Sequence, residues 1–356
     1  MDDKTLETIR WGIVGTGTMA EQFARDLTLS RGAALAAVSA RGLEKANAFA
    51  ARHGDSVSAH ATYAALLGDS AVDAVYIATP NDTHFAIAQT AIESGKAVLV
   101  EKPLVTTSAD AAKLEALAAG RDVFLMEAMW TRFLPAIAKT KSLIERGAIG
   151  DVTRLSGTLA FHHPYEPESR FYSKARGGGA MLDLGVYGIS LARFLLGEPM
   201  KVIGEWRAAP TGVDMSASVT LVFNREVEAH FSCAFDHEGD NRFIVEGSKG
   251  ILILQPPFIA ARAVLQCRKG FAAHIAAFSG RSTLSRVIRK LVYRLPLPGI
   301  QRHAFPFEGY GLRFEIEAAS EAIRAGQNRH RLMSPSDTAR TLEVVEKVLA
   351  DANRQA

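Results

Sequence analysis

The alternation of short apolar runs with helical patterns over the first 126 residues is the feature that most constrains the fold. The apolar runs are predicted to be strands at Arg10–Val14, Leu35–Ala40, Ala74–Ala78, Ala97–Val100 and Val123–Met126. Segments with apolar residues three and four apart lie between them and are predicted to be helices at Met19–Leu27, Leu43–Arg52, Thr83–Ser94 and Ser108–Ala119. Because strand–helix–strand units close with right-handed crossovers, this order predicts a doubly wound parallel sheet with helices on both faces.

The chain after Met126 changes to mainly strand patterns. Strands are predicted at Val152–Phe161, Lys201–Arg207, Ala217–Phe223, Val227–Phe235, Arg242–Glu246 and Gly250–Leu254. Helices are predicted at Pro135–Arg146, Gly179–Leu196, Tyr310–Ala325 and Ser336–Asn353. Strands that follow one another with short turns predict an antiparallel or mixed sheet. We therefore expect two domains, residues 1–127 and residues 128–356, with the last helices able to pack back on the first domain.

The composition is that of a soluble globular protein, with 48% hydrophobic and 22% charged side chains in 356 residues. No apolar run reaches the ~18 residues of a membrane span, and the acidic N-terminus MDDKTLETIR lacks the features of an export signal. The two cysteines, Cys233 and Cys267, form neither a disulfide framework nor a metal-ligand pattern. We therefore expect a cytoplasmic protein.

The net charge of +3 is unevenly distributed. No Asp or Glu lies between Glu246 and Glu308, a stretch that holds ten Lys and Arg residues, so the rest of the chain is net acidic. This distribution argues against nucleic acid as a partner of the whole chain. Within the extra length at residues 268–303, residues 281–300 have the pattern of a basic amphipathic helix. We expect its apolar face to pack against protein, with peripheral contact to an anionic membrane as the alternative.

A glycine-rich turn follows the first predicted strand and reads Gly15-Thr16-Gly17-Thr18-Met19-Ala20. In a dinucleotide-binding fold the first glycine makes the tight turn and the second lets the pyrophosphate approach the backbone. A small third residue, here Ala20, then lets the helix pack on the strand. The N–H groups at the start of that helix would receive the phosphates. The alternative, a glycine turn without a ligand, agrees less well with its place on the first strand of an alternating array.

The end of the second predicted strand distinguishes NADP from NAD. NAD enzymes usually have Asp or Glu there to bind the ribose 2′-hydroxyl, whereas an arginine suits a 2′-phosphate. Here the strand ends in Ser39-Ala40-Arg41, and the first carboxylate is Glu44. Arg41 offers a planar fork of donors and Ser39 adds a hydroxyl, so NADP is predicted, with NAD as the alternative cofactor. A solvated turn residue is the other interpretation of Arg41.

Glu101-Lys102-Pro103 follows the strand that begins at Ala97. Ligands of doubly wound sheets bind beyond the carboxyl ends of the strands, so Glu101 and Lys102 are directed at the site. A lysine in this place can hydrogen-bond a substrate hydroxyl and lower the pKa of a neighbouring acid. Farther along the chain, Asp183 and Tyr187 are four residues apart in a predicted helix and would share one face.

Together these motifs resemble the Gfo/Idh/MocA oxidoreductase family, from about residue 10 to the C-terminus. The resemblance rests on the glycine turn, on Glu101-Lys102-Pro103, and on two further stretches, Ala78-Thr79-Pro80-Asn81 followed by His84 and Gly177-Gly178-Gly179-Ala180-Met181-Leu182-Asp183-Leu184-Gly185-Val186-Tyr187. The subgroup of dihydrodiol dehydrogenases and NADP-linked xylose dehydrogenases is similar at Met126-Glu127-Ala128-Met129-Trp130-Thr131-Arg132-Phe133. The resemblance implies an N-terminal Rossmann domain and a C-terminal α/β domain. The large, open-faced, mostly antiparallel sheet of that second domain would join a homodimer or a dimer of dimers.

The resemblance also implies roles for individual residues. Lys102 would orient the reacting hydroxyl or carbonyl, and Tyr187 would be the general acid/base, where many family members have histidine. Asp183 would complete this catalytic group. The cofactor-binding positions beyond the glycine turn, Ser39 and Arg41 would be Thr79, Pro80, Asn81, His84, Glu101 and Lys102. Candidate substrate contacts are Trp130, Arg132, Arg170 and Tyr172, for which core packing or the framing of a loop is the alternative.

These observations predict an NADP-dependent oxidoreductase that acts on a secondary alcohol or hemiacetal of a sugar, polyol or diol. The expected partner is therefore a carbohydrate-like small molecule. No metal is expected, because hydride transfer needs none and the adjacent His162 and His163 would point to opposite faces of a strand. The alternative function is a non-catalytic dinucleotide-binding regulator of the same family, which would not need Lys102, Asp183 and Tyr187 together.

Overall fold

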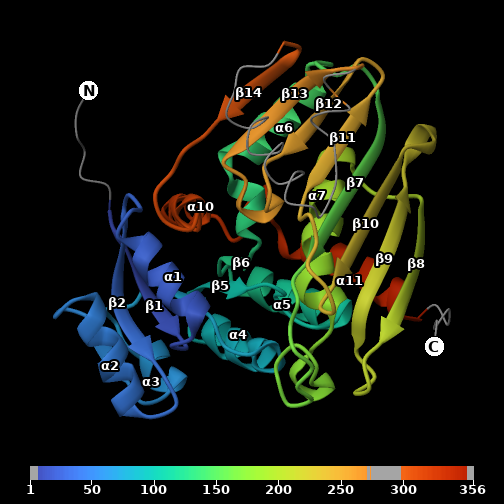
Figure 1. Ribbon diagram of the computed structural model, residues 1–356. Helices are drawn as coiled ribbons and strands as arrows, with labels where there is room; N and C mark the ends of the chain where they lie inside the picture. The colour runs from blue at the N-terminus through green and yellow to red at the C-terminus, as the bar shows by residue number, and fades with distance from the viewer. Residues whose placement is uncertain (1–6, 271–272, 274–297, 351–356) are drawn as a thin grey trace, which may run out of the picture. The chain divides into compact units, whose positions relative to one another are not determined.

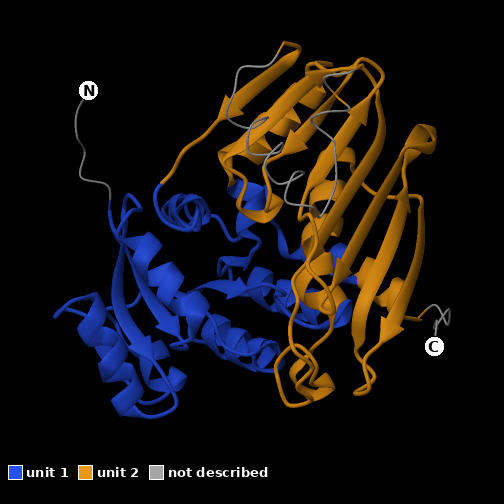
Figure 2. Ribbon diagram, viewed as in Figure 1, with its two compact units in different colours: residues 1–133, 308–342 blue, residues 134–307, 343–356 orange. Residues whose placement is uncertain are grey.

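A computed structural model describes residues 7–270, 273 and 298–350. The chain divides into two compact units (Figure 2). Unit 1 comprises residues 1–133 and 308–342, and unit 2 comprises residues 134–307 and 343–356. The first boundary lies a few residues after the position expected from the sequence, and a C-terminal segment belongs to the first unit.

Unit 1 contains sheet A, whose six parallel strands have the order β3-β2-β1-β4-β5-β6 (Figure 1). The strands are β1 (Ile9–Val14), β2 (Ala33–Ser39), β3 (Ser58–His60), β4 (Ala74–Ile77), β5 (Ala97–Glu101) and β6 (Leu125–Ala128). The helices between them are α1 (Thr18–Leu27), α2 (Leu43–His53), α3 (Tyr63–Leu67), α4 (His84–Glu93) and α5 (Ser108–Gly120). Only β3 and α3 are missing from the sequence prediction, because segments of three and five residues are too short to show a period. The strand order reverses between β1 and β4, where sheets of this kind bind ligands.

Sheet A is covered on both faces, which explains why its strands are nearly continuous apolar runs. Every residue of β4 and β5 is buried, as are Trp11 and Ile13 of β1. Phe23 of α1 stacks on Tyr76 of β4 with 3.7 Å between the ring centroids. The glycine turn and the loop after β5 therefore rest on a closely packed core.

Residues 308–342 return to unit 1 and continue its core. α10 (Arg313–Arg324) starts against α1, where the buried Asp26 carboxylate accepts hydrogen bonds from the backbone N–H groups of residues 310–313 at 2.8–3.3 Å. This carboxylate satisfies N–H groups that the first turn of a helix leaves without partners. Farther along α10, Ser320 accepts a hydrogen bond from the Trp11 indole at 3.1 Å.

Unit 2 contains sheet B, whose eight strands have the order β14-β13-β12-β11-β7-β10-β9-β8. The strands are β7 (Val152–Ala160), β8 (Lys201–Ala208), β9 (Asp214–Val222), β10 (Glu228–Ala234), β11 (Phe243–Gly247), β12 (Gly250–Leu254), β13 (Ala263–Arg268) and β14 (Ile300–Ala304). All neighbours are antiparallel except β7 and β10, which are parallel. α6 (Pro135–Glu145) contacts β12–β14, and α7 (Val186–Leu196) contacts β7 and β10. β13 and β14 lie in the basic stretch and are absent from the sequence prediction.

The helix predicted over Gly179–Leu196 is not one continuous α-helix. Met181–Gly185 forms a π-helical turn, in which the Val186 N–H bonds to the Met181 carbonyl five residues back, and α7 follows. A π turn adds a residue to the helical repeat. The side-chain register therefore changes along this segment, and the placement of Asp183 and Tyr187 on one face stays a prediction.

The predicted fold class is confirmed, with a parallel doubly wound sheet in unit 1 and a mostly antiparallel sheet in unit 2. α11 (Pro335–Ala350) closes the described part of the chain. Residues 281–297, which make up most of the predicted basic amphipathic helix, lie outside the described residues. Within the described ranges, one helical stretch, Lys174–Leu196, is long and apolar enough to span a membrane, and 89% of its most apolar part is buried inside the protein.

Candidate active site

The glycine turn lies between β1 and α1, at the carboxyl edge of sheet A. Gly15 has a φ of 112°, and a Cβ there would lie 2.6 Å from the Ala78 carbonyl oxygen, so the chain itself requires glycine. Gly17 precedes α1 without a side-chain cap, and a Cβ there would meet nothing within 4 Å. No neighbour in the described chain explains glycine at this second position. The open space fits a ligand that approaches the backbone closely, as a pyrophosphate does.

The other residues of the turn differ in exposure. Thr16 and Met19 are half-buried and Thr18 is exposed, so their backbone N–H groups lie near the surface at the start of α1. Ala20 is completely buried. Its small side chain lets α1 pack closely on the sheet, which a larger residue would prevent.

β2 ends beside this turn, since the Gly15 N–H donates to the Ser39 carbonyl at 2.9 Å. The buried Ser39 hydroxyl has no hydrogen-bond partner among the described residues. Arg41 is exposed and also makes no hydrogen bond or ion pair with the part of the chain that the structure describes. A 2′-phosphate would supply acceptors for both groups. The residues at the end of β2 therefore fit NADP.

The loop after β4 backs onto the glycine turn. A Cβ on Gly15 would lie 3.5 Å from Cγ2 of Thr79, in addition to its approach to Ala78. Pro80 is exposed and Asn81 is half-buried at the start of a short 3₁₀ turn that leads into α4. These residues therefore line the carboxyl edge of sheet A next to the pyrophosphate turn.

His84 is buried at the start of α4 and joins two loops. Its Nδ1 lies 2.9 Å from the Pro103 carbonyl oxygen, and its Nε2 lies 2.8 Å from the Thr79 carbonyl oxygen. Burial lowers the pKa of the ring, which favours the neutral form. Because both nitrogens contact the backbone, His84 supports these two loops, and the cofactor contact expected from the sequence stays a prediction.

Buried acids hold the backbone of the loop that carries Lys102. The Lys102 N–H donates to Glu101 Oε2 at 3.1 Å, and the Leu104 N–H donates to Glu127 Oε1 at 2.9 Å. The Lys102–Pro103 peptide is cis, and the Lys102 side chain is half-buried. The loop therefore presents Lys102 at the carboxyl edge of sheet A on a backbone with little freedom.

Glu101 is itself a buried acid at the end of β5. Tyr76 of β4 donates a hydrogen bond from its hydroxyl to Glu101 Oε1. Burial raises the pKa of Glu101 to about 7, although the bond from Tyr76 and the charge of Lys102 oppose that shift. The Glu101 side chain thus holds the loop through the Lys102 N–H, and with a pKa of about 7 this carboxyl group changes protonation near neutral pH.

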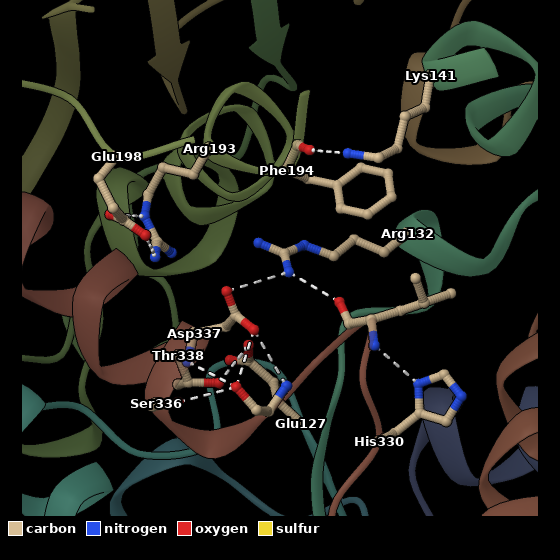
Figure 3. Close-up of polar contacts among 12 residues, drawn as sticks. Glu127, Arg132, Lys141, Arg193, Phe194, Glu198, His330, Ser336, Asp337 and Thr338 are labelled. Carbon is tan, nitrogen blue, oxygen red and sulfur yellow. Dashed lines mark hydrogen bonds and ion pairs between the residues drawn. The ribbon is translucent and has the colours of Figure 1, made fainter. Parts of the chain in front are cut away.

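Arg132 and Glu127 are both tied to the C-terminal part of unit 1 (Figure 3). Arg132 is 3% exposed, and its Nη1 donates to the Leu332 carbonyl at 2.8 Å and lies 3.7 Å from Asp337 Oδ1. Glu127 accepts a hydrogen bond from the Thr338 hydroxyl at 2.9 Å. A buried guanidinium with these partners argues against the substrate contact expected for Arg132.

Trp130 and Tyr172, the aromatic candidates for substrate contact, are buried as well. The Tyr172 hydroxyl donates to the His163 carbonyl at 3.0 Å, and its ring packs edge-on against Phe235. These contacts favour the framing of a loop for Tyr172. For Trp130, burial favours core packing.

A carboxylate at the start of β9 accepts a hydrogen bond from the first turn of the helical segment that carries Asp183 and Tyr187. Asp214 accepts a hydrogen bond from the Met181 N–H at 2.6 Å, and burial raises its pKa to about 7. Gly179 has a φ of 125°, and a Cβ there would collide with Asp214 Oδ1. Glycine at position 179 is therefore required by this close approach.

Asp183 and Arg170 lie together in unit 2. Arg170 Nη1 is 3.2 Å from Asp183 Oδ1, and the Arg170 guanidinium lies over the Phe171 ring at 4.0 Å. The same Phe171 ring stacks on His163, with 3.8 Å between the ring centroids. Burial lowers the pKa of His163. Tyr187 is buried in the first turn of α7. Arg170 thus has an acid as its partner, which gives it a role in holding Asp183.

The far end of α7 is also held by polar contacts (Figure 3). Arg193 pairs with both carboxylate oxygens of Glu198, at 3.0 and 2.7 Å. Lys141 of α6 donates to the Phe194 carbonyl at 2.8 Å. The helix with Tyr187 is therefore anchored at its start by Asp214 and at its end by these two cations.

Some buried side chains that hold the loops of the candidate site were not predicted from the sequence. Asp214 is a buried acid whose only signal is a carboxylate next to apolar residues, and Glu127 lies in the stretch 126–133 that resembles a subgroup of the family, but no role was predicted for it. Tyr76 has no signal at all, since tyrosine is ordinary in a strand. Among the described residues, no group of three or more His, Cys, Asp or Glu side chains is placed to hold a metal ion.

Solved structures share this fold. A 3-ketoreductase from Actinomadura kijaniata, in complex with NADP and TDP-benzene, has a TM-score of 0.80 and 24% identity over 96% of this chain and 97% of its own. An aldose-aldose oxidoreductase from Caulobacter crescentus, complexed with glycerol, has a TM-score of 0.80 and 22% identity over 96% of this chain and 96% of its own. At these identities the similarity establishes the fold alone.

Curated relatives match at higher identity. A trans-1,2-dihydrobenzene-1,2-diol dehydrogenase of Homo sapiens is 30% identical over 344 residues, which is 96% of each chain. The enzyme of the same name from Macaca fuscata fuscata is 35% identical over 253 residues, 70% of this chain and 75% of its own.

Two family profiles cover consecutive parts of the chain. The profile described as "Oxidoreductase family, NAD-binding Rossmann fold" matches residues 9–129. The profile described as "GFO/IDH/MocA C-terminal domain" matches residues 137–253. The glycine turn, the supported Lys102 loop and the two sheets are therefore those of a member of the Gfo/Idh/MocA oxidoreductase family, to which this chain belongs.

Proposed function

We propose that the protein is an NADP-dependent oxidoreductase that transfers a hydride between nicotinamide and a CH–OH carbon of a sugar, polyol or diol. The glycine turn would hold the pyrophosphate, and Ser39 and Arg41 would bind the 2′-phosphate. The unexplained space at Gly17 and the unpartnered Ser39 hydroxyl support this assignment. The NADP complex of the Actinomadura ketoreductase is consistent with it.

The observation that carries the proposal is the support of the Lys102 loop. Buried Glu101, Glu127 and His84 contact the backbone of residues 102–104. Such support costs stability, because two carboxylates are buried to provide it. A protein that only binds a dinucleotide has no need of a lysine held in this way, so the arrangement favours catalysis.

In the proposed reaction, Tyr187 takes the hydroxyl proton as the alcohol is oxidised and returns it in the reverse direction. When bound, the nicotinamide would accept the hydride, so that the substrate C–H bond breaks as its C=O bond forms. A tyrosine with a pKa of ~10 is a poor base at neutral pH unless a cation lowers that value. Lys102 would be that cation and would orient the substrate oxygen, and Asp183 would support Tyr187 from the same helical segment.

The substrate class remains a sugar, polyol or diol. The relatives at about 30% identity are named for a vicinal diol, and the Caulobacter neighbour was solved with glycerol. Both are small molecules with several hydroxyls, as the predicted carbohydrate-like partner is. In the cytoplasm, the location that we propose, both buried cysteines would stay reduced, in agreement with their unpaired state.

The proposed assembly is a homodimer or a dimer of dimers through the face of sheet B opposite α6 and α7. Hydroxyls of neighbouring strands lie side by side there, with Ser232 paired in register to Thr158 on one side and to Ser218 on the other. Charged side chains stand beside these hydroxyls, and the Ser218 hydroxyl donates to Glu205 of β8 at 3.2 Å. A polar face of this kind can pair with a second copy through hydrogen bonds. Light scattering of the purified protein tests it.

A substrate panel tests the function. Aldoses, cyclic polyols and diols are offered with NADP and with NAD, and the reduced nicotinamide is followed by its absorbance. We expect turnover with NADP on at least one of these classes. Tyr187→Phe should keep NADP affinity and lose on the order of 10²-fold in turnover, because the proton can no longer be transferred.

Tyr165→Phe is the matched control, since Tyr165 is an exposed tyrosine of the same unit. It should turn over at the wild-type rate. NADP binding without turnover on any class would support the regulator instead, and normal turnover by Tyr187→Phe would place the acid/base elsewhere.

A further inference from the structure

His84 contacts two loops that have different tasks. One ring nitrogen meets the loop after β4, and the other meets the loop after β5. Both partners are backbone carbonyl oxygens, which can only accept a hydrogen bond. A neutral imidazole has a single N–H group, so it donates to one carbonyl at a time. The nitrogen with the proton holds its carbonyl by a hydrogen bond, and the other nitrogen packs against the second carbonyl within 2.9 Å. The ring therefore sets the spacing of the two loops.

The Nε2 contact acts on the cofactor side. Its partner is the Thr79 carbonyl, at 2.8 Å. Thr79 backs the glycine turn at Gly15, and its hydroxyl is 2.7 Å from the Thr83 hydroxyl, which also donates to the Pro80 carbonyl. A shift of Thr79 would therefore change the packing behind the glycine turn at Gly15.

The Nδ1 contact acts on the catalytic side. Its partner is the Pro103 carbonyl, at 2.9 Å, directly after Lys102 in the chain. The neighbouring N–H groups of Lys102 and Leu104 are held by Glu101 and Glu127. Three consecutive backbone groups of this loop therefore contact buried side chains: the Lys102 N–H, the Pro103 carbonyl and the Leu104 N–H. His84 contacts the second of them.

We propose that His84 is a positioning residue that sets Lys102 through Nδ1 and the cofactor-binding loop through Nε2. This inference rests on the proposed function for its turnover measurement. It predicts that substitutions can separate the two contacts, because one affects kcat and the other affects the affinity for NADP. Loss of the Pro103 contact should lower kcat, and loss of the Thr79 contact should weaken NADP binding.

Two amide variants separate the contacts. The amide nitrogen of asparagine is attached at the γ carbon, like Nδ1, and that of glutamine reaches the position of Nε2. His84→Asn therefore keeps the Pro103 contact, and we expect roughly ten-fold weaker NADP binding with kcat within two-fold of wild type. His84→Gln keeps the Thr79 contact, and we expect kcat to fall roughly ten- to hundred-fold, with NADP affinity within two-fold.

A milder variant provides a second test in case the His84 variants do not fold. Thr83→Val removes the hydroxyl that also holds Thr79 and leaves the His84–Pro103 contact in place. It should weaken NADP binding without lowering kcat. His303→Gln is the control for the loss of a histidine, because His303 contacts the Gln266 side chain from β14, an edge strand of sheet B in unit 2. It should change neither quantity.

The inference fails if both His84 variants lose kcat and NADP affinity in the same proportion, if they lose neither, or if Thr83→Val lowers kcat. Its failure differs from the failure of the proposed function. In the latter case the wild-type protein itself shows no turnover, and the NADP affinities of His84→Asn and His84→Gln, measured by calorimetry, still decide whether Nε2 acts on the cofactor side.

Discussion

At the scale of single residues, we expect the end of β2 to decide which cofactor the protein prefers. Ser39 and Arg41 are polar groups without partners among the described residues, beside a turn whose second glycine faces open space. A buried hydroxyl without a partner costs free energy, and a ligand that accepts its hydrogen bond, as proposed here, would remove that cost. Arg41 is exposed, and its planar fork can close on a phosphate without any cost of burial.

Arg41→Ala should weaken NADP binding roughly ten- to hundred-fold, the effect of losing a charge-assisted hydrogen bond, and leave NAD binding nearly unchanged. Titration calorimetry with both nucleotides measures this. Lys113→Ala, which removes an exposed cation from α5 of the same unit, should affect neither. An equal loss of affinity for NADP and NAD would contradict the assignment of Arg41 to the 2′-phosphate.

At the scale of elements, the segment with Asp183 and Tyr187 depends on contacts at both of its ends. The glycine run lets Asp214 reach the first N–H groups, and the π turn then shifts the register before α7 begins. Gly188 lies on α7 where a Cβ would collide with the Phe231 ring of β10, so the helix sits directly on sheet B. π turns inside helices are frequent at functional sites, which agrees with the role proposed for Tyr187.

Asp214→Ala leaves buried N–H groups at the start of this segment without an acceptor. We expect it to lower the free energy of unfolding by roughly 1–3 kcal/mol and to reduce turnover, while NADP affinity stays within two-fold because the cofactor residues belong to unit 1. Urea unfolding and NADP titration measure the two effects. Asp151→Ala, at an exposed aspartate of unit 2, should be neutral. A variant of Asp214 with full stability would show that the segment does not depend on this carboxylate.

At the scale of the whole molecule, buried acids make the stability depend on pH. Glu315, in the first turn of α10, is completely buried, and its carboxylate oxygens have no hydrogen-bond partner among the described residues. Burial raises the pKa of Glu315 well above its usual value, and the charges of Glu101, Asp26 and Glu127 raise it further. The folded protein therefore holds this proton to a higher pH than the unfolded chain does.

The sign follows from that difference. Above pH ~4.3, the pKa of an unfolded glutamate, the folded state binds more protons than the unfolded state, so the contribution of Glu315 to stability falls as the pH rises. Glu315→Gln does not titrate. We expect its stability relative to wild type to increase between pH 5 and pH 8, by at most ~1.4 kcal/mol per pH unit.

Thermal or urea unfolding at several pH values measures this change. Glu321→Gln, at an exposed position of the same helix, should run parallel to wild type, because that side chain is solvated before and after unfolding. A constant difference between Glu315→Gln and wild type across the pH range would contradict the buried, protonated state of Glu315.

The main strands and helices of unit 1, and the grouping of its candidate site residues at one edge of sheet A, could be predicted from the sequence. Its signals are local: each strand–helix pair repeats an apolar period, and the glycine turn, Arg41 and Lys102 each follow a strand directly. In a parallel sheet all strand ends of one kind lie on one edge, so order along the chain is enough to group these residues. The strands of sheet B through β12 were also found, because their alternation is local.

The side chains that support those residues could not be predicted, because their contacts depend on tertiary packing. His84 meets carbonyls five and 19 residues away, Arg132 meets a carbonyl 200 residues away, and Asp26 caps a helix more than 280 residues away. None of these pairs has a period or a motif, because each partner is a backbone group that every residue carries. Which carbonyl or N–H lies within 3 Å of a buried side chain depends on how distant segments pack, and that is a property of the folded chain alone.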